Sequence, residues 1–594
     1  MKQQQPPAFD LKNVIMAMAL SMLIIFGWQY YYAGPQAKKA EELATQQKTQ
    51  VELTQKNQPA AVAAPIDHAS AIAANPRVPI KTDQFDGSIN LKGAELDDLH
   101  LVKYRELADP NSPAITLLSP NGTTNAYFVA QGFLPLQGET AKLPDASTLW
   151  QAPEGSVLTT EKPVTLTWDN GAGLKFERTI SITDDYLFNV SQTITNSTPT
   201  SVSIVPYARV QRQDQPVIAG YWVFFEGLLG VQNSGLEEHK YSELKKNPDK
   251  PVTVESTGGW LGFTDKYWST ILIPEKTEKI KATYSYVPAG ARDAWQADYL
   301  ATEPLVIAPG TAVTYQDKVF SGVKIVSSIN AIYDKYGFDH FDLMIDWGWF
   351  RPLTKGMFYL LSFVHGIVGN FGIAILLVTV LVKAAVFPLA SRSYASMSKM
   401  KKLKPEMDAI KAKYPDDRAK VQQETMELYK REKVSPLAGC LPMVVQIPVF
   451  FSLYKVILTT IELRHAPFFG WIHDLSAPDP TSLFNLFGLI PWSPPHALMI
   501  GVWPLIMGVT MWVQMRLNPE PTDPIQAQMF NWMPVMFTFM LGGFPAGLVI
   551  YWCWSNTLSV LQQSYIMKKN GAEVNVLGNI RNSIPFLRPK PKGA

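Results

Sequence analysis

Cysteine is almost absent from this chain of 594 residues. Its two cysteines, Cys440 and Cys553, both lie in apolar stretches, which excludes a disulfide framework and a cysteine-based zinc site. The eight histidines are scattered and form no HExxH pair, and no phosphate-binding P-loop pattern occurs. These absences predict a protein that is not an enzyme, with no catalytic residue, no metal ligand set and no cofactor.

Net charge is also small, but it is unevenly distributed. The formal charge is +2, while residues 391–435 hold 12 Lys/Arg against 7 Asp/Glu and residues 568–594 hold 6 against 1. Each of these two segments therefore carries +5, which leaves −8 for the rest of the chain. This asymmetry indicates specific basic loops in a chain that is not basic as a whole.

Long apolar runs begin near the N-terminus. Residues 14–32 approach the roughly 20 residues that cross a bilayer, and Trp28 with Tyr30, Tyr31 and Tyr32 closes the run as interfacial aromatics do. A cleaved signal peptide is the alternative, but bulky tyrosines stand where small residues should precede the cleavage site. The sequence therefore favours an uncleaved transmembrane anchor within residues 1–34.

A polar region separates this anchor from the remaining apolar runs. Residues 35–77 are rich in Ala, Gln, Lys and Pro, which is typical of a flexible linker. Residues 78–335 predict one large β-sandwich, because apolar residues alternate through 164–210 and Asp169-Asn170-Gly171 supplies a hairpin turn. No catalytic constellation stands out in it, so we expect a scaffold or docking domain.

The chain changes character in its second half. Residues 336–368 mix tryptophans with Arg351 and Lys355, which predicts an amphipathic helix lying at the membrane interface. Five apolar runs follow, and with the first anchor they predict a polytopic α-helical membrane protein with six spans. The five runs are residues 369–390, 436–458, 499–515, 529–544 and 546–567, which together with the loop 391–435 form a five-helix core over 369–567.

Orientation follows from the basic loops. The positive-inside rule places 391–435 and the basic tail 568–594 in the cytoplasm. Counting spans backward then places the large β domain outside the membrane and both termini in the cytoplasm. The loop 461–498, which falls outside as well, holds Arg464 as its single Lys or Arg.

Lys383 interrupts the second apolar run. A lysine at mid-span costs roughly 2.5–3.5 kcal/mol, so it normally faces a cavity or a partner unless it extends its ammonium to the interface. Thr379 lies one helical turn earlier, and other runs carry polar residues at helical spacing but no acidic one. These residues are Gln446, Thr510, Gln514, Trp552, Ser555, Ser559 and Gln562. They favour a shared wet groove, although ordinary interhelical hydrogen bonding would give a similar pattern.

The basic loop 391–435 predicts a helical hairpin. Met400, Leu403, Met407, Ile410 and Tyr414 recur at helical spacing, and a second helix follows the break at residues 415–417. Its basic, methionine-bearing surfaces could contact a nascent chain, a ribosome or anionic lipid, or its lysines could merely fix topology. The basic tail offers the same choice between ribosomal RNA and lipid headgroups.

Three motifs resemble one family. They are SPLAGCLPMVVQIPVFFSLY at 435–454, WIHDLSAPDP at 471–480 and FPAGLVIYW at 544–552 with Ser555-Asn556. They resemble the bacterial YidC membrane insertases, as does the order of anchor, large domain and five-span core. The resemblance implies a periplasmic β-supersandwich and an inner-membrane insertase and chaperone acting alone or with the Sec translocon. Its expected partners are nascent inner-membrane proteins, membrane lipids and the ribosome.

The resemblance also implies a site. Lys383 would be the cation of a hydrophilic groove that attracts acidic parts of a substrate, with Thr379 beside it. Gln446, Gln514 and Trp552 would line the groove, and Ile447, Pro448, Phe450 and Tyr551 would contact substrate. Many family members carry arginine where this chain has Lys383, so a point charge would replace a forked one.

Two other functions compete with insertion. A polytopic solute transporter with a periplasmic docking domain would use the same polar stripes, but it would favour inverted repeats, and none is evident. An envelope enzyme acting on a glycan through the β domain would need carboxylates or histidines that converge in a pocket.

Overall fold

The structure is a computed structural model that describes residues 65–136, 139–216, 224–288, 292–415, 417–434, 441–490, 492, 500–517 and 524–571. The predicted anchor, most of the predicted linker and nearly all of the basic tail lie outside the described residues. Residues 65–519 and 532–594 form one compact unit. The described part of the second unit, residues 524–531, is the beginning of helix α13 (Pro524–Leu541).

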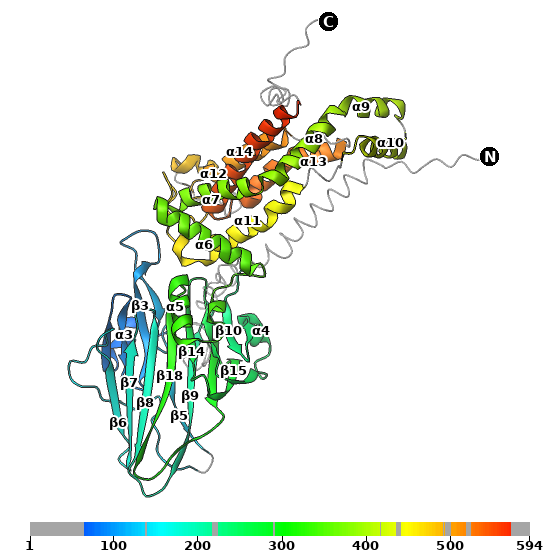
Figure 1. The fold of residues 1–594 in the computed structure, drawn as a ribbon. Helices are drawn as coiled ribbons and strands as arrows, with labels where there is room; N and C mark the ends of the chain where they lie inside the picture. Colours follow the sequence, from blue (N-terminus) through cyan, green and yellow to red (C-terminus); the bar gives the residue numbers. More distant parts are fainter. Residues whose placement is uncertain are drawn as a thin grey trace, which may run out of the picture. The chain divides into compact units, whose positions relative to one another are not determined.

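Two antiparallel sheets build the β domain (Figure 1). The 10-stranded sheet runs β1 (Arg77–Lys81), β2 (Phe85–Asn90), β3 (Glu95–Arg105), β5 (Tyr127–Pro135), β9 (Val202–Gln213), β16 (Ala294–Ala301), β15 (Lys279–Tyr286) and β12 (Val252–Thr257), with β4 (Ala114–Leu118) on β3 and β17 (Leu305–Ile307) on β9. The 8-stranded sheet runs β11 (Gly235–His239), β10 (Gly227–Gln232), β13 (Trp260–Thr264), β14 (Trp268–Ile273), β18 (Thr311–Val323), β8 (Leu187–Asn196), β7 (Leu174–Ile182) and β6 (Val164–Asp169).

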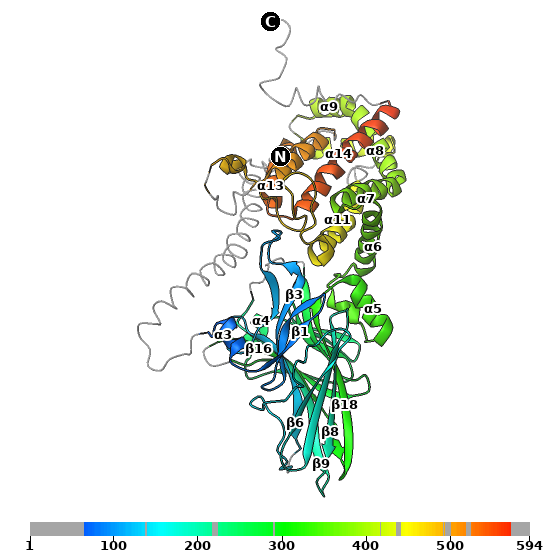
Figure 2. The same cartoon turned by 90° about the vertical axis from the view of Figure 1, so that its left-hand side faces the viewer.

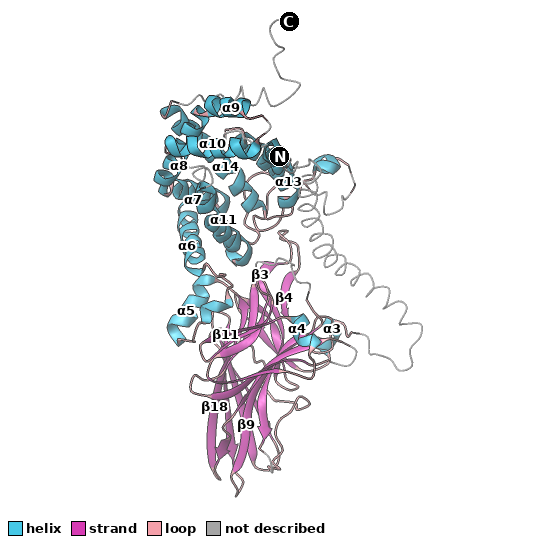
Figure 3. Ribbon diagram, turned by 90° about the vertical axis from the view of Figure 1, so that its right-hand side faces the viewer, coloured by secondary structure: helices cyan, strands magenta, loops and turns pink. Residues whose placement is uncertain are grey.

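Aromatic side chains join the two sheets across a shared core. Phe133 on β5 lies 6.2 Å, ring to ring, from Phe176 on β7, and Tyr127 on β5 lies 5.7 Å from Phe263 on β13. Such pairs add to the burial of apolar area that holds two sheets face to face. The predicted β-sandwich is therefore confirmed, and Figure 3 shows its strands as one region.

The alternation predicted for residues 164–210 is confirmed in four strands. In β7 every second side chain from Leu174 to Ile182 is buried. The predicted turn joins β6 to β7, with Gly171 at φ +70° and its N–H donating to the Asp169 carboxylate at 2.8 Å. Glycine takes this left-handed conformation without the strain that a Cβ would add.

A short helix lies inside the segment predicted as linker. Helix α3 (His68–Ala73) begins after Asp67, whose carboxylate accepts from the Ser70 N–H at 3.2 Å. Ile66 just before it donates its N–H to the carbonyl of Gly122 at 3.0 Å. Composition alone predicted an unstructured segment up to residue 77, because a single capping aspartate is a local signal that an average over forty residues hides.

The helical region begins with α5 (Val326–Tyr336), η2 (Phe341–Met344) and α6 (Arg351–Val368). Helix α6 covers most of the segment predicted to lie at the interface. Its inner face buries residues at helical spacing, including Met357, Leu361 and Val364. Its outer face leaves Phe363 69% and Ile367 70% exposed, and large apolar side chains at such exposure mark a surface suited to lipid or a partner.

Within the residues that the structure describes, eight further α-helices and two short 3-10 helices follow α6. They are α7 (Phe371–Ala385), α8 (Phe387–Lys402), α9 (Lys404–Lys413), α10 (Arg418–Arg431), α11 (Leu441–Thr459), η4 (Ile461–Leu463), η5 (Leu483–Gly488), α12 (Val502–Met515), α13 and α14 (Ala546–Lys569), beside α4 (Tyr241–Lys246) in the β domain. Helix α14 packs against α7, α8, α11 and α12, and this set carries the candidate site (Figure 2).

The run predicted as one span over residues 369–390 is bent. Helices α7 and α8 meet at Val386 with an angle of 67°, and Pro388 stands in the first turn of α8. A proline there lacks the N–H that would continue the helix, and it clashes with the preceding turn. The predicted run therefore covers α7 and the beginning of α8, and the bend between them was not predicted.

Within the described residues, no single helix is both long and apolar enough to cross a membrane, while the bent pair α7 and α8 could do so by length and composition. The predicted count of six spans stays a prediction.

Candidate functional site

Lys383 lies in the last turn of α7 and points to α14. Its ammonium donates to the hydroxyl of Ser559 at 2.8 Å, and that hydroxyl donates to the carbonyl of Ser555 at 2.8 Å. The bend at Val386 ends the helix soon after the lysine, so Lys383 lies near the negative end of the α7 dipole. This position offsets part of the cost of burying a cation, by about 0.3–1 kcal/mol.

Two depressions meet at Lys383, with volumes of about 400 Å³ and 250 Å³. Both are lined by Val382, Lys383, Gln446 and Val449. The larger adds Val386, Leu389, Ala390, Tyr394, Val445 and Gln562, and the smaller adds Met357, Val378, Thr379, Leu453 and Tyr551. The half-buried ammonium thus stands between two hollows whose walls are mainly aliphatic, with a few neutral polar groups.

No carboxylate balances this charge from the neighbouring helices. The sequences of α7, α8, α11, α12 and α14, as bounded above, contain no aspartate or glutamate. The ammonium donates to the neutral Ser559 hydroxyl. A cation solvated by hydroxyl and amide groups keeps most of its field available to an anion that enters the depressions.

Gln446 and Tyr551 form a second polar contact in the smaller depression. The Gln446 amide donates to the Tyr551 hydroxyl, and Tyr551 is otherwise buried. Thr379 lines the same hollow, but its hydroxyl donates to the Ile375 carbonyl of its own helix at 2.6 Å. The structure therefore brings together four of the residues that the sequence placed at the groove, namely Lys383, Thr379, Gln446 and Tyr551.

The other residues that the family resemblance placed at the groove line neither depression. Trp552 packs on Phe450 with ring centroids 4.6 Å apart and on Phe537 at 6.2 Å, which forms an aromatic cluster. Neither Trp552 nor Gln514 lines either depression at Lys383. Ile447 is 48% exposed on α11, and Pro448 next to it is half-buried. The spacing of polar residues in the sequence predicted a polar face on each helix. It did not predict how each helix is rotated about its axis, which decides whether that face lines the depressions.

Comparison of the chain with known proteins identifies its family. The model of the YidC periplasmic domain matches residues 77–360, and that of the 60Kd inner membrane protein matches residues 363–573. A curated membrane protein insertase YidC from Bradyrhizobium diazoefficiens is 48% identical over 612 residues, covering 96% of this chain and 98% of that protein. The chain belongs to the YidC family.

Another relative and a solved structure match as well. The membrane protein insertase YidC of Nitrobacter hamburgensis is 48% identical and covers 96% of this chain and 97% of that protein. A crystal structure of an active YidC insertase with its first transmembrane domain is 18% identical, with a TM-score of 0.34, and covers 81% of this chain and 90% of that one.

Two residues at the site of this YidC-family chain have roles that the sequence did not predict. Ser559 was one member of a polar stripe, yet it is the hydrogen-bond partner of Lys383. Tyr394 on α8 lines the larger depression, although the sequence assigned it to the cytoplasmic loop. The sequence offers one signal for the place of Tyr394, namely Pro388, because it follows the end of α7 at Ala385 and stands in the first turn of the new helix α8 that carries Tyr394.

The basic hairpin is formed by α9 and α10, and its apolar stripe faces inward. Leu403, Met407, Leu428 and Val434 are buried together, and the Tyr429 hydroxyl donates to the Met407 sulfur at 3.3 Å. The predicted methionine-bearing contact surface is therefore wrong for this stripe, since two short helices need a core of their own. The lysines and arginines remain on the outside, for example Arg431.

The β domain has a depression of its own, of about 300 Å³, where carboxylates and arginines meet. Glu95 and Asp145 line it beside Arg178, Arg209 and Trp150. Burial, and then the charge of Asp97, raises the pKa of Glu95 to about 7. The Asp145 carboxylate accepts hydrogen bonds from Ser147 and Thr148 of its own turn, and Arg178 is engaged in structural hydrogen bonds.

Proposed function

We propose that this chain inserts membrane proteins through the two depressions at Lys383. One observation carries the proposal: a half-buried ammonium lines both hollows and has a neutral hydroxyl as its hydrogen-bond partner. The names of the curated relatives, which are membrane protein insertases, support it. Catalysis in the chemical sense is not needed, because insertion moves a chain without making or breaking covalent bonds.

Electrostatics sets the scale of the attraction. Two opposite unit charges 4 Å apart gain about 4 kcal/mol at the effective dielectric typical of such sites. That gain exceeds the roughly 2.5–3.5 kcal/mol that a charge costs at mid-span. An acidic or strongly polar segment of a substrate therefore enters the depressions at little net cost. Its apolar segment then moves along the aliphatic walls into lipid.

Because residue 383 is a lysine, the attraction depends on its charge and not on a fixed hydrogen-bond geometry. Lysine presents a compact charge and three donors, without the planar fork that grips a carboxylate through two parallel bonds. Ser559 takes one of these donors. The remaining donors can turn toward a passing group, so the site attracts anions without holding them in one geometry.

The wider setting completes the proposal. The chain lies in the bacterial inner membrane with its β domain in the periplasm and both termini in the cytoplasm. It acts as insertase and as chaperone, alone or beside the Sec translocon. The basic exterior of the α9–α10 hairpin and the basic tail contact the ribosome or anionic lipid. The excess of lysine and arginine in these segments supports this part of the proposal.

Photo-crosslinking tests the path of the substrate. A photoreactive amino acid at Val449, which lines both depressions, should crosslink to the transmembrane segment of a ribosome-bound nascent chain. The matched control is Val509 on α12, which is 61% exposed and lines neither depression. Equal yields at the two positions, or a crosslink at Val509 alone, would contradict this path.

Ser559 offers a second test with a smaller effect. Ser559→Ala removes the partner of the Lys383 ammonium, which water can partly replace, so insertion should slow by about threefold to tenfold. Thr557→Val is the control, because that hydroxyl donates to the Cys553 carbonyl of its own helix at 2.8 Å. Insertion into inverted vesicles gives the rates. Identical rates for the two variants would show that Ser559 does not position the lysine.

A further inference from the structure

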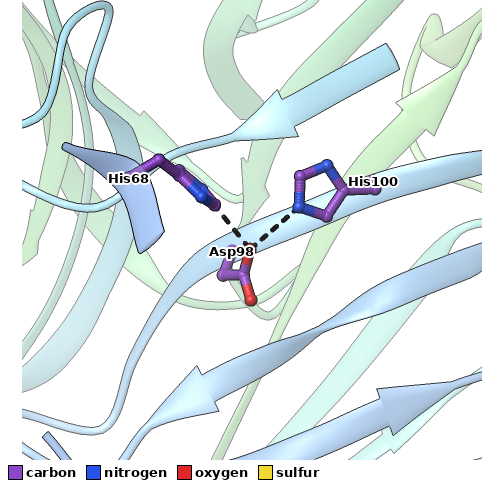
Figure 4. A group of neighbouring side chains, drawn as sticks. All are labelled: His68, Asp98 and His100. Atoms are coloured by element: carbon purple, nitrogen blue, oxygen red, sulfur yellow. Dashed lines mark ion pairs between the residues drawn. The ribbon is translucent and has the colours of Figure 1, made fainter. Parts of the chain in front are cut away.

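Three side chains suited to binding a metal ion converge on the β domain, far from Lys383 in the sequence. Figure 4 shows the rings of His68 and His100 pointing toward the carboxylate of Asp98. The His68 Nε2 atom lies 3.6 Å from Asp98 Oδ1, and the His100 Nε2 atom lies 3.2 Å from the same oxygen. One ligand atom from each residue lies within 4.8 Å of the other two.

Local structure explains the convergence. Asp98 and His100 are two residues apart on β3, so their side chains leave the strand on the same face. His68 is the first residue of α3, and the Asp67 cap and the bond from Ile66 to Gly122 fix the beginning of that helix. The cluster therefore joins the beginning of α3 to β3, the third strand of the β1–β2–β3 series.

Two atoms of the cluster are unsatisfied within the described part of the chain. His68 Nε2 and Asp98 Oδ1 are both buried and have no hydrogen-bond partner there. Leaving a buried polar atom unpaired costs about 1–3 kcal/mol, so two such atoms facing each other at 3.6 Å need an explanation. An ion between them would satisfy both.

Two other polar atoms of the cluster, Asp98 Oδ2 and His100 Nδ1, are held by their neighbours. The Ser88 hydroxyl donates to Asp98 Oδ2 at 2.6 Å and accepts from the Arg77 Nε–H at 2.7 Å. His100 Nδ1 lies 3.1 Å from the Thr116 hydroxyl oxygen on β4. If Nδ1 carries the proton and donates to Thr116, the lone pair of Nε2 faces Asp98, as in an imidazole that binds a metal.

We propose that His68, Asp98 and His100 bind a divalent transition-metal ion of the zinc class. In a tetrahedral site with bonds of roughly 2.0–2.2 Å, ligand atoms lie about 3.4 Å apart. Two of the three separations here, 3.2 and 3.6 Å, already fit, and a small turn of one ring closes the third. Two imidazoles exclude calcium and magnesium, which take oxygen ligands.

The exposure of the rings leaves room for a fourth ligand. The His68 and His100 side chains are 33% and 31% exposed, so an ion can enter from solvent and water can complete the site. Metal binding would fasten α3 to β3 at the point where the chain enters the β domain. Because such a site is assembled only in the folded domain, its binding free energy adds to stability.

Metal titration of the full-length, tag-free protein in detergent tests the proposal. We expect the metal-stripped protein to bind one Zn²⁺ per chain by calorimetry. Co²⁺ should give the visible absorption of a low-symmetry site with nitrogen ligands. His68→Gln and His100→Gln should each lower the Zn²⁺ affinity at least tenfold. Zn²⁺ should raise the unfolding temperature of the natural protein but not that of His68→Gln.

His340→Gln is the matched control, because His340 lies 3.6 Å from Asp339 with no second histidine in the pair. Its affinity for Zn²⁺ should equal that of the natural protein. Unchanged stoichiometry and affinity in His68→Gln, or no Zn²⁺ binding by the natural protein, would overturn the proposal and leave an ordinary histidine–aspartate cluster. If His100→Gln fails to fold, His68→Gln decides alone, since a partly exposed ring on a short helix is dispensable for the core.

Discussion

Lys383→Glu should abolish growth of a strain that depends on this protein for insertion, while Lys383→Arg should support it. Charge reversal turns an attraction on the order of 4 kcal/mol into a repulsion of similar size, and loss of the attraction alone corresponds to a roughly 1,000-fold fall in insertion rate. Arginine retains the charge and reaches the same depressions. Complementation after depletion of the resident insertase, with membrane levels checked by immunoblot, measures the outcome.

The uncharged variants separate charge from packing in this first prediction. Lys383→Met keeps most of the length and volume of the side chain but removes the charge, so it should insert strongly acidic substrates poorly and apolar ones nearly normally. Lys383→Ala should behave in the same way, with a further loss from the enlarged hollow. Wild-type insertion of acidic substrates by Lys383→Met would show that the charge is dispensable and would overturn the electrostatic role.

Arg178→Met should destabilise the β domain by about 3–5 kcal/mol, which corresponds to a fall of roughly 10 °C in unfolding temperature. Arg178 on β7 is 2% exposed and donates to the carbonyls of Ala94 and Gln131 at 3.0 and 2.7 Å. Its other donors reach the Gln192 side chain at 2.8 and 3.0 Å. It therefore ties the 8-stranded sheet to the 10-stranded one, and its loss removes the donors from three acceptors, among them the buried Gln192 side chain.

The protonation of Arg178 does not alter this second prediction near neutral pH. Burial lowers the pKa of the guanidinium to about 10, which still leaves it charged. Arg178→Lys should also destabilise, because an ammonium cannot reproduce the fork that spans Ala94, Gln131 and Gln192. Lysine would recover part of the loss through its charge.

Thermal unfolding of the full-length protein in detergent, followed by fluorescence, measures both Arg178 variants. Lys175→Met is the matched control on the same strand, because its side chain is 52% exposed and pairs only with Glu177 at the surface. It should change stability by less than about 0.5 kcal/mol. An Arg178→Met protein as stable as Lys175→Met would show that the sheets do not depend on this side chain.

Much of the architecture could be predicted from local patterns. Alternation along residues 164–210 predicted strands with one buried face, and Asp169-Asn170-Gly171 predicted their turn, because strand and turn formation depend on neighbouring residues. Lys383 was evident because a cation in an apolar run is costly wherever the helix lies. The long motifs at 435–454, 471–480 and 544–552 indicated the family.

Other features depend on how helices and strands turn toward one another. The bond from Lys383 to Ser559 and the separation of Trp552 and Gln514 from the depressions follow from packing between distant segments. The inward stripe of the α9–α10 hairpin is of the same kind.

The cluster of His68, Asp98 and His100 is the clearest example of a feature that the sequence did not predict. The sequence has no HExxH pair and predicted no metal site, since His68 and Asp98 are thirty residues apart and belong to no known spacing. The fold brings the beginning of α3 to β3 and sets the His68 Nε2 and Asp98 Oδ1 atoms 3.6 Å apart. The sequence by itself determined the β domain, the apolar helices, the cation at 383 and the family. Only the tertiary structure decided which polar atoms meet, because periodicity fixes the face of a helix or strand but not the neighbour that this face contacts.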